Sequence, residues 1–238
     1  MTRRILLSVP PVLLIAFGLV YWTTAPGAAR ADRGVPPLPV PPANHIVYLI
    51  EKDAVSANTP IAPERLEVVL GAKIAHSWEK VRELDRGRPI EALIIHASTL
   101  GQVDNNWTSE AYRRGVVLAG INISVGDMAD LANDRCIARD GFASEAMSGD
   151  YFVVVSSLIQ GDPEDVAKIE AARTNGCSEE PASEIKGLTA VYGGRTFDEI
   201  VSTTELDIFA NAVADHLIDV AEAKDEFESG KLLEPYEE

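Results

Sequence analysis

The fold of this chain is decided by Glu91-Ala92-Leu93-Ile94-Ile95-His96 and by a second apolar run, Val116-Val117-Leu118-Ala119-Gly120-Ile121. Each run is short and apolar, as a buried β-strand requires. Asp104 is a suitable N-cap for a helix between them, and Arg113-Arg114-Gly115 places cations and a glycine at the end of that helix. Strand, helix and strand within about 30 residues predict a βαβ unit with parallel strands.

The same alternation continues along the rest of the chain. We expect further strands at His45–Ile50, Tyr151–Val155 and Gly187–Tyr192, and helices at Pro63–Leu84, Pro163–Arg173 and from Ser202 onward. A break of the first helix at Gly71 is the alternative for its first part. Gly193-Gly194-Arg195 is expected to form a tight turn before the last helix.

Alternating apolar strands and amphipathic helices predict an α/β fold. Its sheet should be open and mostly parallel, with four to five strands and helices on both faces. The alternation is similar to that of flavodoxin-like and Rossmann-like sheets, which host many unrelated functions. We also expect a hydrophobic helix to precede this domain at the N-terminus.

The N-terminal residues 1–22 have the pattern of an export segment. Arg3 and Arg4 precede 18 uncharged residues, Ile5–Trp22, which would span roughly 27 Å as a helix. Tyr21 and Trp22 suit an aromatic belt and favour a retained single-pass anchor in the cytoplasmic membrane. Ala29-Arg30-Ala31 fits a cleavage site, so release into the periplasm or the medium after cleavage near Ala31 is the alternative.

Residues 23–44 form a linker between this segment and the domain. Val35–Pro42 holds five prolines in eight residues, which favours an extended polyproline II spacer. The remaining residues, 45–238, are expected to form one α/β domain that ends in an acidic helix and tail. Membrane contact is therefore expected only through residues 5–22, if they are retained.

The chain is strongly acidic, with a formal net charge of −16. Such a surface repels phosphate backbones, which excludes nucleic acid as an expected partner. A protein partner remains compatible with this charge.

Cys136 and Cys177 are the two cysteines of the chain. An even pair in an exported protein predicts a disulfide between them. Two buried free thiols are the alternative.

Candidate site residues follow from the rule that open parallel sheets bind ligands beyond the carboxyl ends of their strands. Glu51 follows the first expected strand, His96 and Ser98 close the second, and Asn122 follows the third. Together they could support acid–base or nucleophilic chemistry if the strands are neighbours. The competing interpretation is that these side chains cap helices and loops. Ser156, Ser157 and Gln160 follow the fourth strand and would lie at the same edge.

Signatures of catalysis and of cofactor binding are absent from the sequence. There is no phosphate-binding glycine loop, no nucleophile elbow and no metalloprotease motif. The other histidines, His45, His76 and His216, show no metal-ligand spacing, and we place His76 on the first helix. We expect no cofactor and no metal.

Three functions remain open on these grounds. The first is a tethered or exported domain that binds a small ligand or a protein partner without catalysis. The second is an exported hydrolase or transferase with a site around His96. The third is a scaffold component of a cell-envelope complex that works through the acidic last helix.

Overall fold

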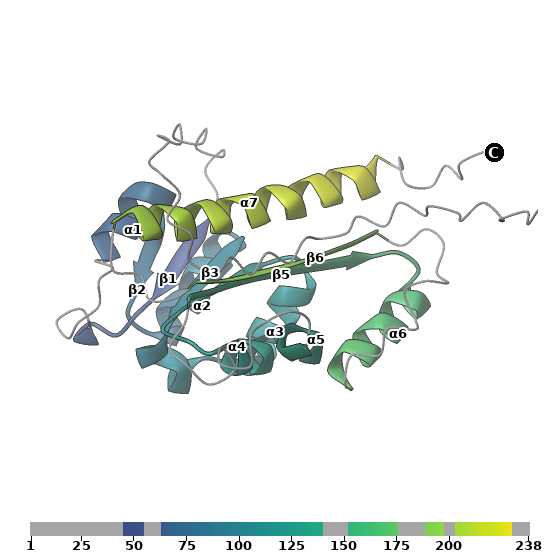
Figure 1. Ribbon diagram of the computed structural model, residues 1–238, viewed down its shortest axis with the longest axis horizontal. Coiled ribbons are helices and arrows are strands. Elements are labelled where there is room, and N and C mark those ends of the chain that lie inside the picture. Colours follow the sequence, from purple (N-terminus) through teal and green to yellow (C-terminus); the bar gives the residue numbers. More distant parts are fainter. Residues whose placement is uncertain (1–44, 55–62, 140–151, 176–188, 198–202, 230–238) are drawn as a thin grey trace, which may run out of the picture.

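The computed structural model describes residues 45–54, 63–139, 152–175, 189–197 and 203–229 (Figure 1). Six strands form one sheet in the order β2-β1-β3-β4-β5-β6. Strands β1 to β4 pair in parallel, whereas β5 is antiparallel to both of its neighbours. Five of the six strands therefore run in one direction, which confirms an α/β fold with a mostly parallel sheet. The strands are β1 (Ile46–Leu49), β2 (Lys73–Ala75), β3 (Ala92–His96), β4 (Val117–Ile121), β5 (Phe152–Gln160) and β6 (Thr189–Phe197).

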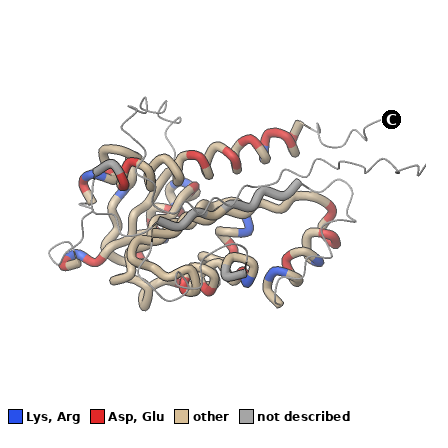
Figure 2. The backbone as a smooth tube through the Cα atoms, viewed as in Figure 1, with Lys and Arg blue, Asp and Glu red and all other residues tan. Residues whose placement is uncertain are grey.

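Helices cover both faces of this sheet, as the sequence predicts. Helices α1 and α7 contribute to the core on one face, and α2, α3 and α4 contribute to the core on the other. In Figure 1, α7 runs along the length of the sheet, and Figure 2 shows acidic residues spread along it. The helices are α1 (Pro63–Leu70), α2 (Trp78–Gly87), the 3₁₀ helix η2 (Ala97–Gln102), α3 (Asn105–Arg113), α4 (Val125–Ala132), α5 (Arg135–Arg139), α6 (Pro163–Thr174) and α7 (Thr203–Glu228).

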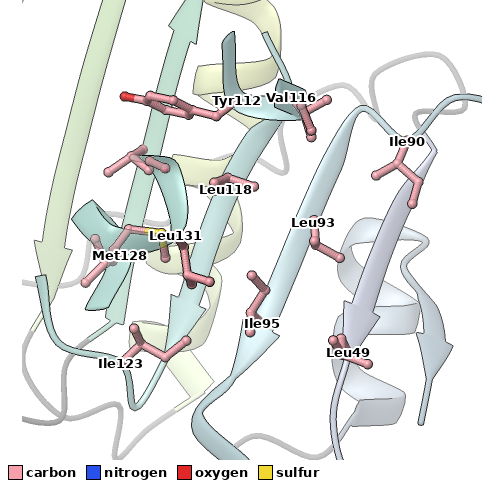
Figure 3. Close-up of a cluster of buried hydrophobic side chains, with 14 of the residues drawn as sticks. Leu49, Ile90, Leu93, Ile95, Tyr112, Val116, Leu118, Ile123, Met128 and Leu131 are labelled. Atoms are coloured by element: carbon pink, nitrogen blue, oxygen red, sulfur yellow. The ribbon is translucent and has the colours of Figure 1, made fainter. Parts of the chain in front are cut away.

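The strands are buried on both sides because their apolar residues alternate between the two cores. Leu93 and Ile95 point to the core under α3 and α4, where Figure 3 shows them with Leu118 and Met128. Ile94 belongs to the opposite core under α1 and α7. This two-sided burial explains the continuous apolar runs in the sequence.

The central βαβ unit is confirmed in detail. Strands β3 and β4 are parallel, with Ala92 opposite Val117 and His96 opposite Ile121. The Asp104 side chain caps α3 by accepting hydrogen bonds from the amides of Asn106 and Trp107, at 3.1 and 3.3 Å.

The prediction of one helix over Pro63–Leu84 is wrong. This stretch contains α1, the short edge strand β2 and the beginning of α2. Gly71 adopts a positive φ of 65° after α1, and the Ser77 hydroxyl caps α2 by accepting a hydrogen bond from the Lys80 amide. The near-helical spacing of apolar residues thus continued across a turn and a strand by coincidence. Strand β2 brings the sheet to six strands.

Two expectations near the C-terminal half are also wrong. Gly193-Gly194-Arg195 lies inside β6 rather than in a turn, opposite Ser156, Val155 and Val154 of β5. Because β5 runs against β4, its carboxyl end points away from the carboxyl ends of β1, β3 and β4. Ser156, Ser157 and Gln160 therefore do not join the expected site.

The predictions for residues 1–22 and 23–44 concern residues outside the described ranges, as does the predicted beginning of the last helix at Ser202. Within the part of the chain that the structure describes, no helix has both the length and the apolar composition to cross a membrane.

Gly115 ends α3 in a position that only glycine fits. Its φ is 85°, and a Cβ atom there would lie 2.9 Å from Cγ1 of Val220 on α7. We expect Gly115→Ala to lower the free energy of unfolding by about 2–4 kcal/mol through backbone strain and overpacking. Gly71→Ala is the matched control, since Gly71 also has positive φ but no atom within 4 Å of such a Cβ. Urea denaturation should show a smaller loss for Gly71→Ala; equal losses would contradict the contact with Val220.

Candidate functional site

The carboxyl ends of β1 and β3 form the topological switch point of the sheet. These two strands are neighbours. The chain leaves β1 toward α1 on one face and leaves β3 toward η2 and α3 on the other. In open α/β sheets such a point is where connections diverge and ligands bind.

Three of the four predicted site residues meet at this point. His96 ends β3, Ser98 lies in the first turn of η2, and Glu51 follows β1. Nδ1 of His96 lies 2.9 Å from the Ser98 hydroxyl, which in turn accepts a hydrogen bond from the Glu51 amide at 3.3 Å. The structure thus brings these three residues together, and their role as a functional site stays a prediction.

The hydrogen bonds of this cluster fix the backbone of the two loops. The Ser98 amide donates to Nδ1 of His96 at 3.1 Å, so the imidazole caps η2. The Thr99 hydroxyl donates to the His96 carbonyl at 2.7 Å, and Gln102 donates to the Glu51 carboxylate at 3.1 Å. Gln102 was not among the predicted residues, because its contact with Glu51 depends on the path of η2.

The tautomer of His96 follows from this arrangement. Because the Ser98 amide can only donate, Nδ1 is the unprotonated nitrogen, and the proton of the neutral ring is on Nε2. The side chain is only 6% exposed, and its buried Nε2 atom has no hydrogen-bond partner in the part of the chain that the structure describes. His96 thus presents an unsatisfied N–H donor beside the switch point, which is an unusual and costly state for a buried polar atom.

Burial lowers the pKa of His96 below its ordinary value of 6.5, and the charge of Glu51 opposes this shift. The folded state then favours neutral histidine, whereas the unfolded chain binds a proton below pH 6.5. The stability from His96 is therefore fully present above pH 6.5 and is lost as the pH falls toward the folded-state pKa.

We expect His96→Asn to remove this pH dependence. Asparagine keeps an acceptor at the position of Nδ1, so the cap on the Ser98 amide is retained while the titrating ring is lost. Urea unfolding between about pH 7.5 and pH 5 should show the wild type losing more stability than the variant. Parallel curves would contradict the assigned direction of the pKa shift.

Asn122 does not share the hydrogen bonds that the described residues of the cluster form. It follows β4 with a positive φ of 57°, and no hydrogen bond to Glu51, His96 or Ser98 is present among the described residues. The next polar residue, Ser124, caps α4 through a hydrogen bond from the Asp127 amide at 3.0 Å. The left-handed backbone and the cap account for the polar residues after this strand.

The remaining histidines have structural contacts. His76 follows β2 rather than lying on a helix, and its Nδ1–H donates to the Ile50 carbonyl at 2.9 Å. His45 donates to the Arg88 carbonyl at 2.8 Å. No group of three or more histidine, cysteine, aspartate or glutamate residues in the described ranges could hold a metal ion.

Two buried polar pairs were not predicted. His216 on α7 lies 2.6 Å from the Ser156 hydroxyl on β5, with exposures of 5% and 0%. Arg173 on α6 forms an ion pair with Asp134, which precedes α5. Each pair joins residues that are far apart in the chain, so no local pattern in the sequence signals them.

Cys136 lies in α5 and takes part in a disulfide. Cys177 lies outside the described residues, so its pairing with Cys136 stays a prediction. The bond would join α5 to the segment that follows α6 in sequence, close to the ion pair that joins Asp134, just before α5, to Arg173 of α6.

Nδ1 of His96 faces the Ser98 hydroxyl, but the same atom caps η2. Among the described residues, no carboxylate orients the ring through Nε2, as it would in a catalytic triad. Comparison with known proteins adds no functional assignment: no family model matches this chain, and no curated protein or solved structure matches it significantly.

Proposed function

We propose that this chain is an exported domain, tethered to the cytoplasmic membrane, that binds a small ligand or a protein partner without catalysis. Residues 5–22 act as the anchor, residues 23–44 as the spacer, and residues 45–238 as the binding domain. The strand order β2-β1-β3-β4 supports a flavodoxin-like arrangement of the parallel part. N-terminal sequencing of membrane-bound protein from the native host tests the anchor; a mature chain that begins near Asp32 would refute it.

The proposal of binding rests mainly on the Nε2–H group of His96. This donor is buried, lies at the switch point and has no hydrogen-bond partner among the described residues, whereas Nδ1 of His96 and the Ser98 hydroxyl bond within the two loops. A ligand with a carbonyl, carboxylate or hydroxyl oxygen would satisfy it. Movement of the loops after β1 and β3 would be needed to admit the oxygen, since the atom is closed to solvent.

Two substitutions distinguish the roles of the two nitrogen atoms of His96. Asparagine keeps an acceptor near the position of Nδ1 and removes the donor at Nε2; glutamine does the reverse. A fragment screen by thermal shift on the full chain should find acceptor-bearing fragments that raise the unfolding temperature of the wild type. We expect these fragments to lose their effect on His96→Asn and to keep part of it on His96→Gln. The opposite ranking, or an absence of stabilising fragments, would overturn binding at this donor.

A hydrolase is the second candidate, because the Ser98 hydroxyl lies 2.9 Å from a histidine nitrogen. If Nδ1 activates Ser98, a fluorophosphonate probe should label Ser98, and both His96→Asn and His96→Gln should abolish labelling, since neither side chain is a base. Stoichiometric labelling of Ser98 would replace the binding proposal by the catalytic one. Unlabelled Ser98 in protein that remains folded would exclude this mechanism.

A further inference from the structure

A cavity of about 480 Å³ lies at the amino ends of β3 and β4. His96 lies at the other end of β3. Its volume is within the range of small-molecule sites. Three segments line it: the connection from α2 to β3, the turn from α3 to β4, and the C-terminal half of α7.

The floor of this cavity is apolar. Ile90 and Val116 precede the two strands, and Leu217 and Val220 face them from α7; all four are at least nine-tenths buried. Ala221 lines the cavity from an exposed position on α7. An aliphatic or aromatic group is therefore the part of a ligand that this floor would accept.

Two carboxylates also line the cavity, and both are fully engaged by the protein. Asp85 accepts hydrogen bonds from the Ile90 amide at 3.0 Å and from the Trp107 indole at 3.3 Å, one on each oxygen. Glu91 accepts from the His45 amide at 2.8 Å and from Arg88 at 3.3 Å, again one on each oxygen. Their four oxygen atoms are thus directed into protein contacts.

Two cationic side chains line the same cavity without such partners. Neither Arg114 nor Lys224 forms an ion pair or a side-chain hydrogen bond within the described ranges. Gly115 allows their approach: Cε of Lys224 lies only 3.4 Å from where a Cβ atom of Gly115 would be. The cavity therefore combines an apolar floor with two cations that form no ion pair with any described residue, although the Asp85 and Glu91 carboxylates also line it.

We propose that this cavity binds an amphipathic carboxylate, such as a medium-chain aliphatic acid. Its chain would lie against Ile90, Val116 and Val220, and its carboxylate would be held by Arg114 and Lys224. A guanidinium can hold a carboxylate through two parallel hydrogen bonds, and a nearby ammonium adds charge. This second site goes beyond the binding at His96, from which it is separated by the length of the parallel strands.

Octanoate labelled with ¹³C at its carboxyl carbon is a suitable probe, used with the full chain in lipid nanodiscs and with empty nanodiscs as the background. We expect saturable binding with one octanoate per chain, and weaker binding of neutral 1-octanol. Arg114→Gln and Lys224→Gln should each weaken octanoate binding about tenfold or more, because each removes a charge-assisted contact. Arg82→Gln is the matched control, since Arg82 is an exposed cation that does not line the cavity.

Ala221→Phe should block binding by filling the cavity from its exposed side, and circular dichroism should show that all variants stay folded. Absence of saturable binding to the full chain would overturn the proposal. Binding that is unchanged by Arg114→Gln, Lys224→Gln and Ala221→Phe would overturn it as well. His96→Asn should bind octanoate like the wild type. A negative result for ligand binding at His96 therefore leaves the proposal for the cavity standing, and the reverse also holds.

Discussion

Replacing Arg173 by methionine should lower the free energy of unfolding by about 3–5 kcal/mol. The ion pair of Arg173 with Asp134 is buried, with 12% of the arginine and 3% of the aspartate side chain exposed. Arg173 also donates to the Ser157 hydroxyl at 2.6 Å and lies 5.7 Å from the centre of the Tyr112 ring. Its removal leaves the Asp134 carboxylate buried without a cation, which is the main cost.

The matched control removes the buried charge together with its partner. Asp134→Asn in the Arg173→Met background should recover part of the loss, since the amide oxygen can still accept from the Cys136 amide while the NH2 group can donate to the Tyr112 hydroxyl. Denaturant unfolding of the wild type, both single variants and the double variant gives the coupling energy. A loss below about 1 kcal/mol for Arg173→Met would show that the pair is not buried in solution.

Replacing Phe209 by alanine should also cost about 3–5 kcal/mol. Phe209 is fully buried where α7 meets the sheet. Its ring packs edge-to-face against Phe152 of β5, with the ring centres 5.8 Å apart and an interplanar angle of 72°. The substitution removes both the buried apolar area and the aromatic contact.

The adjacent residue provides the control for Phe209. Ile208 is on the same helix but is 47% exposed. We expect Ile208→Ala to change the free energy of unfolding by about 0.5 kcal/mol or less, because exposed positions contribute little and alanine favours the helix. Similar losses for the two variants, measured by thermal and denaturant unfolding, would mean that α7 does not pack against the sheet through Phe209.

The parts of the fold that could be predicted are those in which local signals agree. Between β3 and β4, two apolar runs, the Asp104 cap and Gly115 all mark the same boundaries, and the structure confirms them. Strand β2 was missed because it has only three residues, and the apolar spacing around it mimics one helix. Gly71 and Ser77 were the available signals for its boundaries.

The direction of β5 could not be predicted for a different reason. Its apolar run, Phe152–Val155, fits a buried strand in either orientation, and only the pairing with Leu118–Ile121 determines which one occurs. The antiparallel pairing with β6 likewise depends on contacts that are distant in sequence.

For the candidate site, the sequence could predict which strand ends meet, but not the hydrogen bonds between their side chains. Glu51, His96 and Ser98 meet because β1 and β3 are adjacent, which the expected parallel sheet allowed. The unsatisfied Nε2–H of His96 could not be foreseen, because it depends on the tautomer imposed by the Ser98 amide. The cavity beside Arg114 and Lys224 requires α7 to lie against the beginnings of β3 and β4.

The position of α7 has a consequence for the timing of folding. The core on one face of the sheet combines Ile46 and Tyr48, among the first described residues, with Phe209 and Val213, among the last. Helix α1 covers part of this face early, but the rest stays uncovered during synthesis until α7 has been made, and closing it requires contacts across most of the domain. The complete core can therefore form only after α7 has left the ribosome, so the domain remains unfolded, or only partly folded, until then.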